Sequence, residues 1–144
     1  MTQNMHTITV IGRQKNGNSQ DEQQFTAPCS VASRDGALYL AYTETDEANH
    51  QTRVTLKFTA STAVMIRNGA GRTRMEFDPA RQTDCDYDTG SGVLPLAIRT
   101  QAVACNLNER GGHARLNYTL YYGGSPLSDN EVLIRLQPIN PDHC

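Results

Sequence analysis

Residues 113–120 read His-Ala-Arg-Leu-Asn-Tyr-Thr-Leu, and this stretch decides the fold class. Every second residue is apolar, namely Ala114, Leu116, Tyr118 and Leu120, while those between are polar or basic. Successive side chains of a β-strand point to opposite faces, so the pattern predicts a strand with one dry face and one wet face. The same alternation recurs along the chain, and helical periodicity is nearly absent, which predicts an all-β protein.

Further strand-like runs follow one another along the chain. They cover residues 6–10, 25–29, 38–42, 54–58, 64–66, 75–77, 85–87, 94–100, 103–107 and 132–136. Glycine-rich turns such as residues 67–71 and 108–112 separate them, and short connections favour a meander. A meander must bury its dry face, either in a sandwich or in a barrel that also removes the sheet edges. We predict one domain over residues 1–144, an antiparallel up-and-down β-barrel of about 8–10 strands.

The composition argues against several classes of protein. The formal net charge is −2, so no basic excess exists to neutralise the phosphates of a nucleic acid. Apolar runs are too short for a transmembrane helix, and the first residues lack the basic and apolar regions of a signal peptide. No pair among Cys29, Cys85, Cys105 and Cys144 has C-x-x-C spacing, so we expect reduced thiols, with Cys144 exposed. These features predict a cytoplasmic protein that binds neither nucleic acid nor membrane.

Several short segments carry a resemblance to a known family. In chain order they are G-x-x-Y-L-x-Y-x-E (residues 36–44), apolar-R-x-G (66–69), G-x-L-x-L-x-I-x-T (92–100), L-x-E-x-G-G (107–112), Y-x-L (118–120) and S-x-N (128–130). Together they resemble the YwiB-like proteins, which are small uncharacterised bacterial proteins with a calycin-like β-barrel. The turns at residues 77–80 and 89–92 depart from the family pattern. The resemblance implies a bacterial, cytoplasmic, lipocalin-like barrel of no known activity, and it carries over no functional residue.

No catalytic or metal-binding motif is recognisable in the sequence. Asp84, Asp86 and Asp88 begin like an EF-hand loop, but Thr89 and Pro95 stand where that loop needs Gly and Glu. The four histidines lack metal-ligand spacing, and no serine lies in a G-x-S-x-G elbow. We therefore expect no enzyme, no bound metal and no cofactor.

The candidate site is the dry face itself. Tyr42, Tyr87 and Tyr118 interrupt its apolar residues, and Glu44 lies in phase beyond Tyr42. Buried tyrosine hydroxyls need partners, which can be one another, water or the polar head of a ligand. The interior of a small barrel is either filled by side chains or holds one small ligand, and the sequence leaves both open. Our hypothesis is a non-catalytic barrel that binds a small, largely apolar molecule in its lumen, on the three tyrosines with Glu44 near the entrance.

The alternative is a solid barrel that acts through its outer surface, as a homo-oligomer or a protein-interaction module. Residues 51–83 carry a net charge of +4 and residues 18–50 a net charge of −5. These segments predict a basic and an acidic patch on neighbouring outer faces, unless the charges simply pair across strands. This alternative expects an exposed apolar patch around Tyr39, Ala41, Met65 or Leu133.

Overall fold

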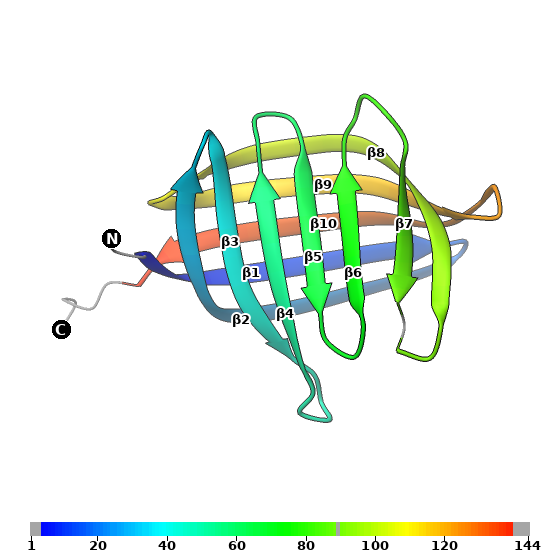
Figure 1. Cartoon of the computed structure of the whole chain (residues 1–144), viewed down its shortest axis with the longest axis horizontal. Helices are drawn as coiled ribbons and strands as arrows, with labels where there is room; N and C mark the ends of the chain where they lie inside the picture. Colours follow the sequence, from blue (N-terminus) through cyan, green and yellow to red (C-terminus); the bar gives the residue numbers. More distant parts are fainter. Residues whose placement is uncertain (1–3, 89, 140–144) are drawn as a thin grey trace.

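A computed structural model of the chain describes residues 4–88 and 90–139, and this part contains ten strands and no helix (Figure 1). The strands are β1 (Asn4–Asn16), β2 (Ser19–Arg34), β3 (Ala37–Thr45), β4 (Gln51–Phe58), β5 (Ala63–Asn68), β6 (Arg72–Phe77), β7 (Thr83–Asp88), β8 (Val93–Asn108), β9 (Gly111–Tyr122) and β10 (Ser125–Pro138). The all-β expectation is confirmed, and no described helix is long and apolar enough to cross a membrane. The expectation for Cys144 falls outside the described residues.

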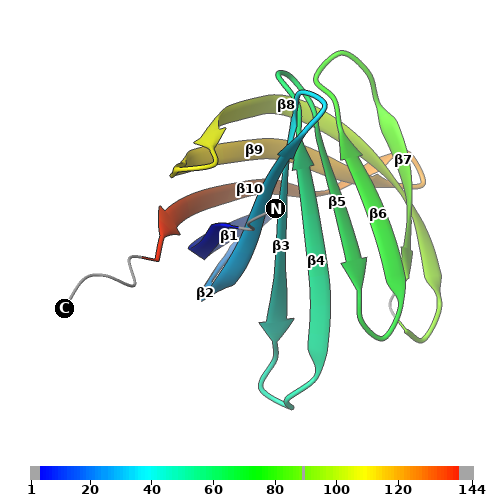
Figure 2. The same cartoon turned by 60° about the vertical axis from the view of Figure 1, so that its left-hand side comes forward.

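All ten strands belong to one antiparallel sheet in the order β6-β5-β4-β3-β2-β1-β10-β9-β8-β7. Neighbours in this order are consecutive in the chain, except β1 and β10, which pair from His6 opposite Pro138 to Lys15 opposite Asp129. The two remaining edges, β6 and β7, are consecutive in the chain and lie side by side (Figure 2). The sheet therefore nearly closes on itself, which confirms the up-and-down barrel.

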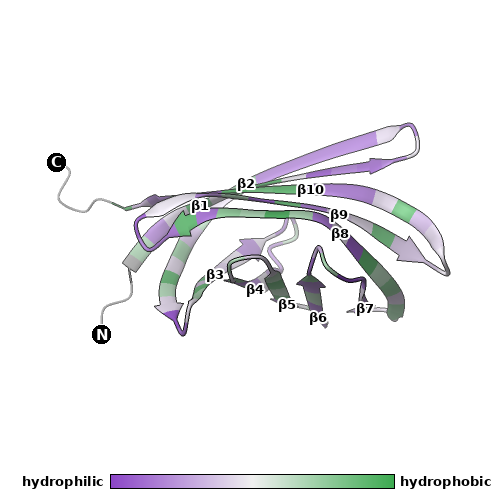
Figure 3. Cartoon of the chain, turned by 90° about the horizontal axis from the view of Figure 1, so that it is seen from above, coloured by the Kyte–Doolittle hydropathy of each residue, from purple (hydrophilic) through white to green (hydrophobic). Residues whose placement is uncertain are grey.

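The barrel is flattened into two layers of strands. In Figure 1, β3 to β7 cross in front of β1, β9 and β10, which run in a different direction behind them. The long strands β2 and β8 belong to both layers because they bend from one to the other. Seen from above in Figure 3, the layer of β1, β2, β8, β9 and β10 lies over the layer of β3 to β7. The space between the layers is the interior of the barrel.

Inward-facing side chains from all ten strands form one apolar cluster in this interior. The largest apolar side chains with almost no exposed surface are Ile8, Leu40, Leu56, Phe58, Phe77, Ile98, Leu116, Ile134 and Leu136. On β9, Ala114, Leu116 and Tyr118 are buried while His113 and Arg115 are exposed, as the alternation in the sequence predicts. The centre of the barrel is thus packed with side chains.

Side chains close the seam between β6 and β7, where no backbone ladder forms. Thr83 Oγ1 donates a hydrogen bond of 2.6 Å to the backbone oxygen of Glu76. At the other end of the seam, the backbone N–H of Asp88 donates to Thr73 Oγ1 over 3.2 Å. Both threonines are buried. At this seam two threonine hydroxyl groups therefore connect the neighbouring strands, which backbone hydrogen bonds connect elsewhere in the barrel.

The turn between β8 and β9 depends on its two glycines. Gly111 and Gly112 have φ angles of 126° and 123°, in the region that residues with a side chain rarely adopt. A Cβ atom on Gly112 would lie 2.0 Å from the backbone oxygen of Asn106. The glycine-rich turn expected at residues 108–112 is therefore a requirement of the fold.

Candidate functional site

An ion pair lies inside the barrel near the ends of β3 and β5. Glu44 follows Leu40 and Tyr42 on the inward face of β3, and Arg67 follows Met65 on the inward face of β5. Arg67 donates from Nη1 to Glu44 Oε2 over 2.9 Å and from Nη2 to Glu44 Oε1 over 2.6 Å. The two side chains are 30 % and 24 % exposed. The geometry is thus the bidentate, half-buried kind of ion pair, which is stronger than a solvated one.

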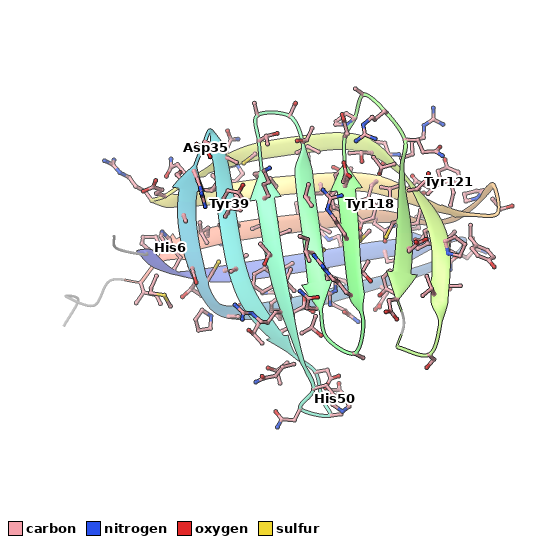
Figure 4. All side chains as sticks on the ribbon, in the orientation of Figure 1. His6, Asp35, Tyr39, His50, Tyr118 and Tyr121 are labelled. Atoms are coloured by element: carbon pink, nitrogen blue, oxygen red, sulfur yellow. The ribbon has the colours of Figure 1, made fainter. Side chains whose placement is uncertain are left out.

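Three inward-facing tyrosines belong to the same end of the barrel. Tyr42 and Tyr118 are 5 % and 9 % exposed, whereas Tyr87 is 37 % exposed. The ring of Tyr42 packs on Phe25 and that of Tyr118 on Phe77, with centroids 5.5 Å and 4.7 Å apart. Tyr118 comes from β9, in the layer behind β6 and β7 (Figure 4). None of the three hydroxyls forms a hydrogen bond with a described residue, and none of their oxygens is fully buried, so water can reach them.

Electrostatic interactions link the tyrosines to the ion pair. Burial raises the pKa of Tyr118 to about 12, and burial together with Glu44 raises the pKa of Tyr42 well above its ordinary value. The charge of Arg67 lowers the pKa of both groups. Burial lowers the pKa of Arg67 itself, but Glu44, Tyr42 and Tyr87 raise it above its ordinary value. Arg67 is therefore the electrostatic centre of this cluster.

Unfilled space adjoins the cluster in three places, one of them a hollow of about 1080 Å³ that Tyr118 lines together with residues of β1, β2, β8 and β10. A hollow of about 260 Å³ is lined by Arg67, Tyr87 and the turn at residues 69–71. A third hollow of about 160 Å³ lies beside Tyr118 and Gly12. A Cβ atom on Gly12 would meet nothing within 4 Å. We call this end of the barrel the mouth, and it is formed by Gly12, Tyr42, Glu44, Arg67, Tyr87 and Tyr118.

One buried polar group near the mouth has no partner among the described residues. Thr100 on β8 pairs in register with Tyr118 on β9, next to an irregularity between Thr100 and Ala102. The Thr100 side chain is buried, and its hydroxyl has no hydrogen-bond partner among the described residues. An unpaired buried hydroxyl costs free energy unless water or a ligand satisfies it.

The sequence identified four of the residues at the mouth: Tyr42, Glu44, Tyr87 and Tyr118. The structure places all four at this end, although Tyr87 is more exposed than a lumen residue would be. The hollows lie at the mouth, while the centre of the barrel is packed. The site is therefore at the entrance of the barrel.

Arg67 was missed because it lies within residues 51–83, whose charges the sequence assigns to an outer face. The alternation along β5 identifies Arg67 as inward-facing, because it lies on the same face of the strand as Ala63 and Met65, which are both buried. The same phase overturns the outer position expected for Met65, which is 8 % exposed. One acidic and one basic residue of the two charged segments thus face inward and pair.

The other residues of the expected apolar patch do not lie together. Tyr39 and Ala41 are on β3 and Leu133 is on β10, with β2 and β1 between them. The ammonium group of Lys57 lies 5.8 Å from the centroid of the Tyr39 ring. All three candidate residues are half-buried, so they form no continuous exposed patch.

Metal-binding and nucleophilic groups are few in the described part of the chain. No group of three or more His, Cys, Asp or Glu side chains in residues 4–88 and 90–139 is placed to hold a metal ion. Cys29, Cys85 and Cys105 are free thiols. Burial raises the pKa of Cys29 to about 11, so its thiol is protonated and unreactive at neutral pH.

Comparison with known proteins gives a family and a fold. Residues 8–134 match the family model described as "Domain of unknown function (DUF1934)". The crystal structure of the ywiB protein from Bacillus subtilis aligns with a TM-score of 0.85 and 18 % sequence identity, over 96 % of this chain and 94 % of that one. No curated protein matches the chain. At this identity the structural likeness concerns the fold alone.

Proposed function

Because the chain belongs to the DUF1934 family, whose description assigns no activity, we propose from the mouth alone that the barrel binds a small molecule there without catalysis. Family membership also confirms the expected resemblance to the YwiB-like proteins. The observation that carries the proposal is the buried hydroxyl of Thr100, which has no partner among the described residues and lies beside Tyr118 at the mouth. Buried polar groups normally have partners, so this hydroxyl supports a partner from outside the chain.

The chemistry of the mouth limits what this partner is. The hollows of about 260 and 160 Å³ are each smaller than a usual ligand pocket, but Tyr118 also lines a hollow of about 1080 Å³, so there is room for a small molecule beside it. The rings of Tyr87 and Tyr118 offer faces for stacking a flat apolar body. Glu44 engages two N–H groups of Arg67, which leaves the other donors of the guanidinium for an acceptor atom. Glu44 also balances the charge, so the ligand is a neutral molecule with a hydrogen-bond acceptor.

We also propose that this binding protein is located in the cytoplasm. The support for it is the state of the thiols, because Cys29, Cys85 and Cys105 are free. Proteins of oxidising compartments more often pair their cysteines as disulfides.

Nuclear magnetic resonance with isotope-labelled tyrosine rings tests the proposal, because the chain carries its own controls. Neutral benzamide and cyclohexanone are titrated against the protein, with anionic benzoate as a matched comparison. We expect a saturable shift of the signals of Tyr42, Tyr87 and Tyr118. The proposal fails if neither neutral probe shifts these signals.

The assignment of each signal comes from single Tyr→Phe variants. Tyr39, Tyr121 and Tyr122 lie away from the mouth and serve as references. Their signals should stay in place while the mouth signals move. Equal shifts of all six tyrosines, or a stronger response to benzoate than to benzamide, would contradict the proposal.

A further inference from the structure

A further hollow lies on the outside of the barrel, away from the interior and the mouth. It measures about 550 Å³ and crosses the outer face of β1, β10, β9 and β8, which is the upper layer in Figure 3. Its lining includes the apolar residues Ile11, Leu133 and Ala104 and the basic residues His113, Arg115 and Arg135. We call these six residues the outer basic groove.

Strand register brings the basic residues together. Arg115 on β9 lies opposite Ala104 on β8 and Leu133 on β10. Arg135 on β10 lies opposite His113 on β9. Opposite residues are roughly 5 Å apart and diagonal neighbours roughly 7–8 Å, so the three basic side chains emerge around Leu133 as one group. All three are exposed.

The groove differs from the rest of this outer face in having no compensating carboxylate. Towards the β1–β2 hairpin, Arg13 pairs with Glu22 over 2.7 Å and with Glu131 over 3.0 Å. Neither Arg115 nor Arg135 forms an ion pair with a described residue, and no acidic residue lines the groove. Adjacent like charges on a sheet are destabilising, and a bound anion would remove that cost.

We propose that the outer basic groove binds a small amphipathic anion. Its carboxylate or sulfonate lies between the guanidinium groups of Arg115 and Arg135, which suit planar, bidentate recognition. Its apolar body lies on Ile11 and Leu133, which are half-buried and form the middle of the groove. This site is independent of the mouth, where the one arginine is already neutralised by Glu44.

Fluorescence titration with anilinonaphthalene sulfonate, an amphipathic anion, tests this site. The double variant Arg115→Gln, Arg135→Gln removes both guanidinium groups. The matched control Arg53→Gln, Arg72→Gln removes two exposed arginines on β4 and β6, in the other layer. We expect the groove variant to bind the probe about tenfold more weakly, and the control to bind it like the wild type.

Competition and a mouth variant complete the test. Octanoate should displace the probe, whereas octyltrimethylammonium at the same concentration should not. Tyr87→Ala should leave the affinity for the probe unchanged, which separates this site from the mouth. The proposal is overturned by unchanged affinity in the groove variant, by equal displacement by the cation, or by a tenfold loss in Tyr87→Ala.

Discussion

A single carboxylate holds the guanidinium of Arg67 inside the barrel. Both hydrogen bonds of the pair are short, and both side chains are mostly removed from water. Removing one partner from such a pair leaves the other charge unpaired in a poorly solvated place, which costs more than losing a surface ion pair. Glu44 therefore both stabilises the barrel and keeps the mouth neutral.

A double-mutant cycle at this pair measures the coupling. We expect Glu44→Gln and Arg67→Met each to lower the free energy of unfolding by about 1–3 kcal/mol, measured by urea unfolding. The double variant should lose less than the two single losses together, because it leaves no unpaired charge behind. Strictly additive losses would mean that the two side chains do not interact in solution.

The buried thiol of Cys29 makes stability depend on alkaline pH. Its pKa is about 11 in the folded protein, against about 9 in an unfolded chain. As the pH rises through this window, the unfolded state releases a proton that the folded state keeps, so the free energy of unfolding falls. Below about pH 9 this contribution is fully present.

We expect the free energy of unfolding to fall between pH 9 and pH 11 by about 2 kcal/mol more in the wild type than in Cys29→Ala. Urea unfolding at several pH values across this range measures it. The comparison uses the slope against pH, because the substitution also changes packing. Tyr118 titrates alike in both proteins, and the pKa of Tyr42 differs between them only by the smallest of its causes, the charge of Cys29. Parallel curves for the two proteins would refute a raised pKa at Cys29.

The strands with one dry face could be predicted from the sequence, but the hydrogen bonds that close the seam between β6 and β7 could not. The alternation at residues 113–120 and the glycines at residues 108–112 are local patterns, so they identify strands and turns without tertiary information. No local sequence pattern distinguishes Thr73 and Thr83, because threonine is common in strands of every kind. Their role depends on which two strands become the edges of the sheet, and only the closed barrel shows that.

The seam should respond to the loss of a single hydroxyl. In Thr83→Val the side chain keeps its shape, but the backbone oxygen of Glu76 loses its hydrogen bond. We expect a loss of about 1–2 kcal/mol in stability and faster hydrogen exchange in β6 and β7. The control Thr43→Val changes an exposed side chain of β3 and should have little effect. Exchange rates at the seam equal to those of the wild type would exclude this role for Thr83.

The β8–β9 turn offers a second comparison between elements. We expect Gly112→Ala to destabilise the protein by about 2–4 kcal/mol, because its φ is positive and the new Cβ atom meets the backbone oxygen of Asn106. Gly12→Ala has neither problem and should be close to neutral in thermal unfolding. Similar stabilities for the two variants would contradict the geometry of this turn.

The site is visible only at the scale of the whole molecule. Phase along a strand put Tyr42, Glu44, Tyr87 and Tyr118 on the inner face, and it also marks Arg67 once β5 is followed residue by residue. It does not reveal that β3 and β5 end beside each other across β4. Because these strand ends are neighbours, Glu44 and Arg67 form one half-buried ion pair instead of two separate surface charges. The unfilled space beside Arg67 therefore lies at an end of the barrel.

Native mass spectrometry of the protein purified from its own organism tests binding at the mouth most directly. Gly12→Leu should block the mouth, because its side chain enters unfilled space without removing any polar group of the site. We expect the wild type to carry an additional small mass that is lost on denaturation, and Gly12→Leu to lack it. A wild-type mass equal to that of the polypeptide alone, or the same additional mass on Gly12→Leu, would contradict binding at the mouth.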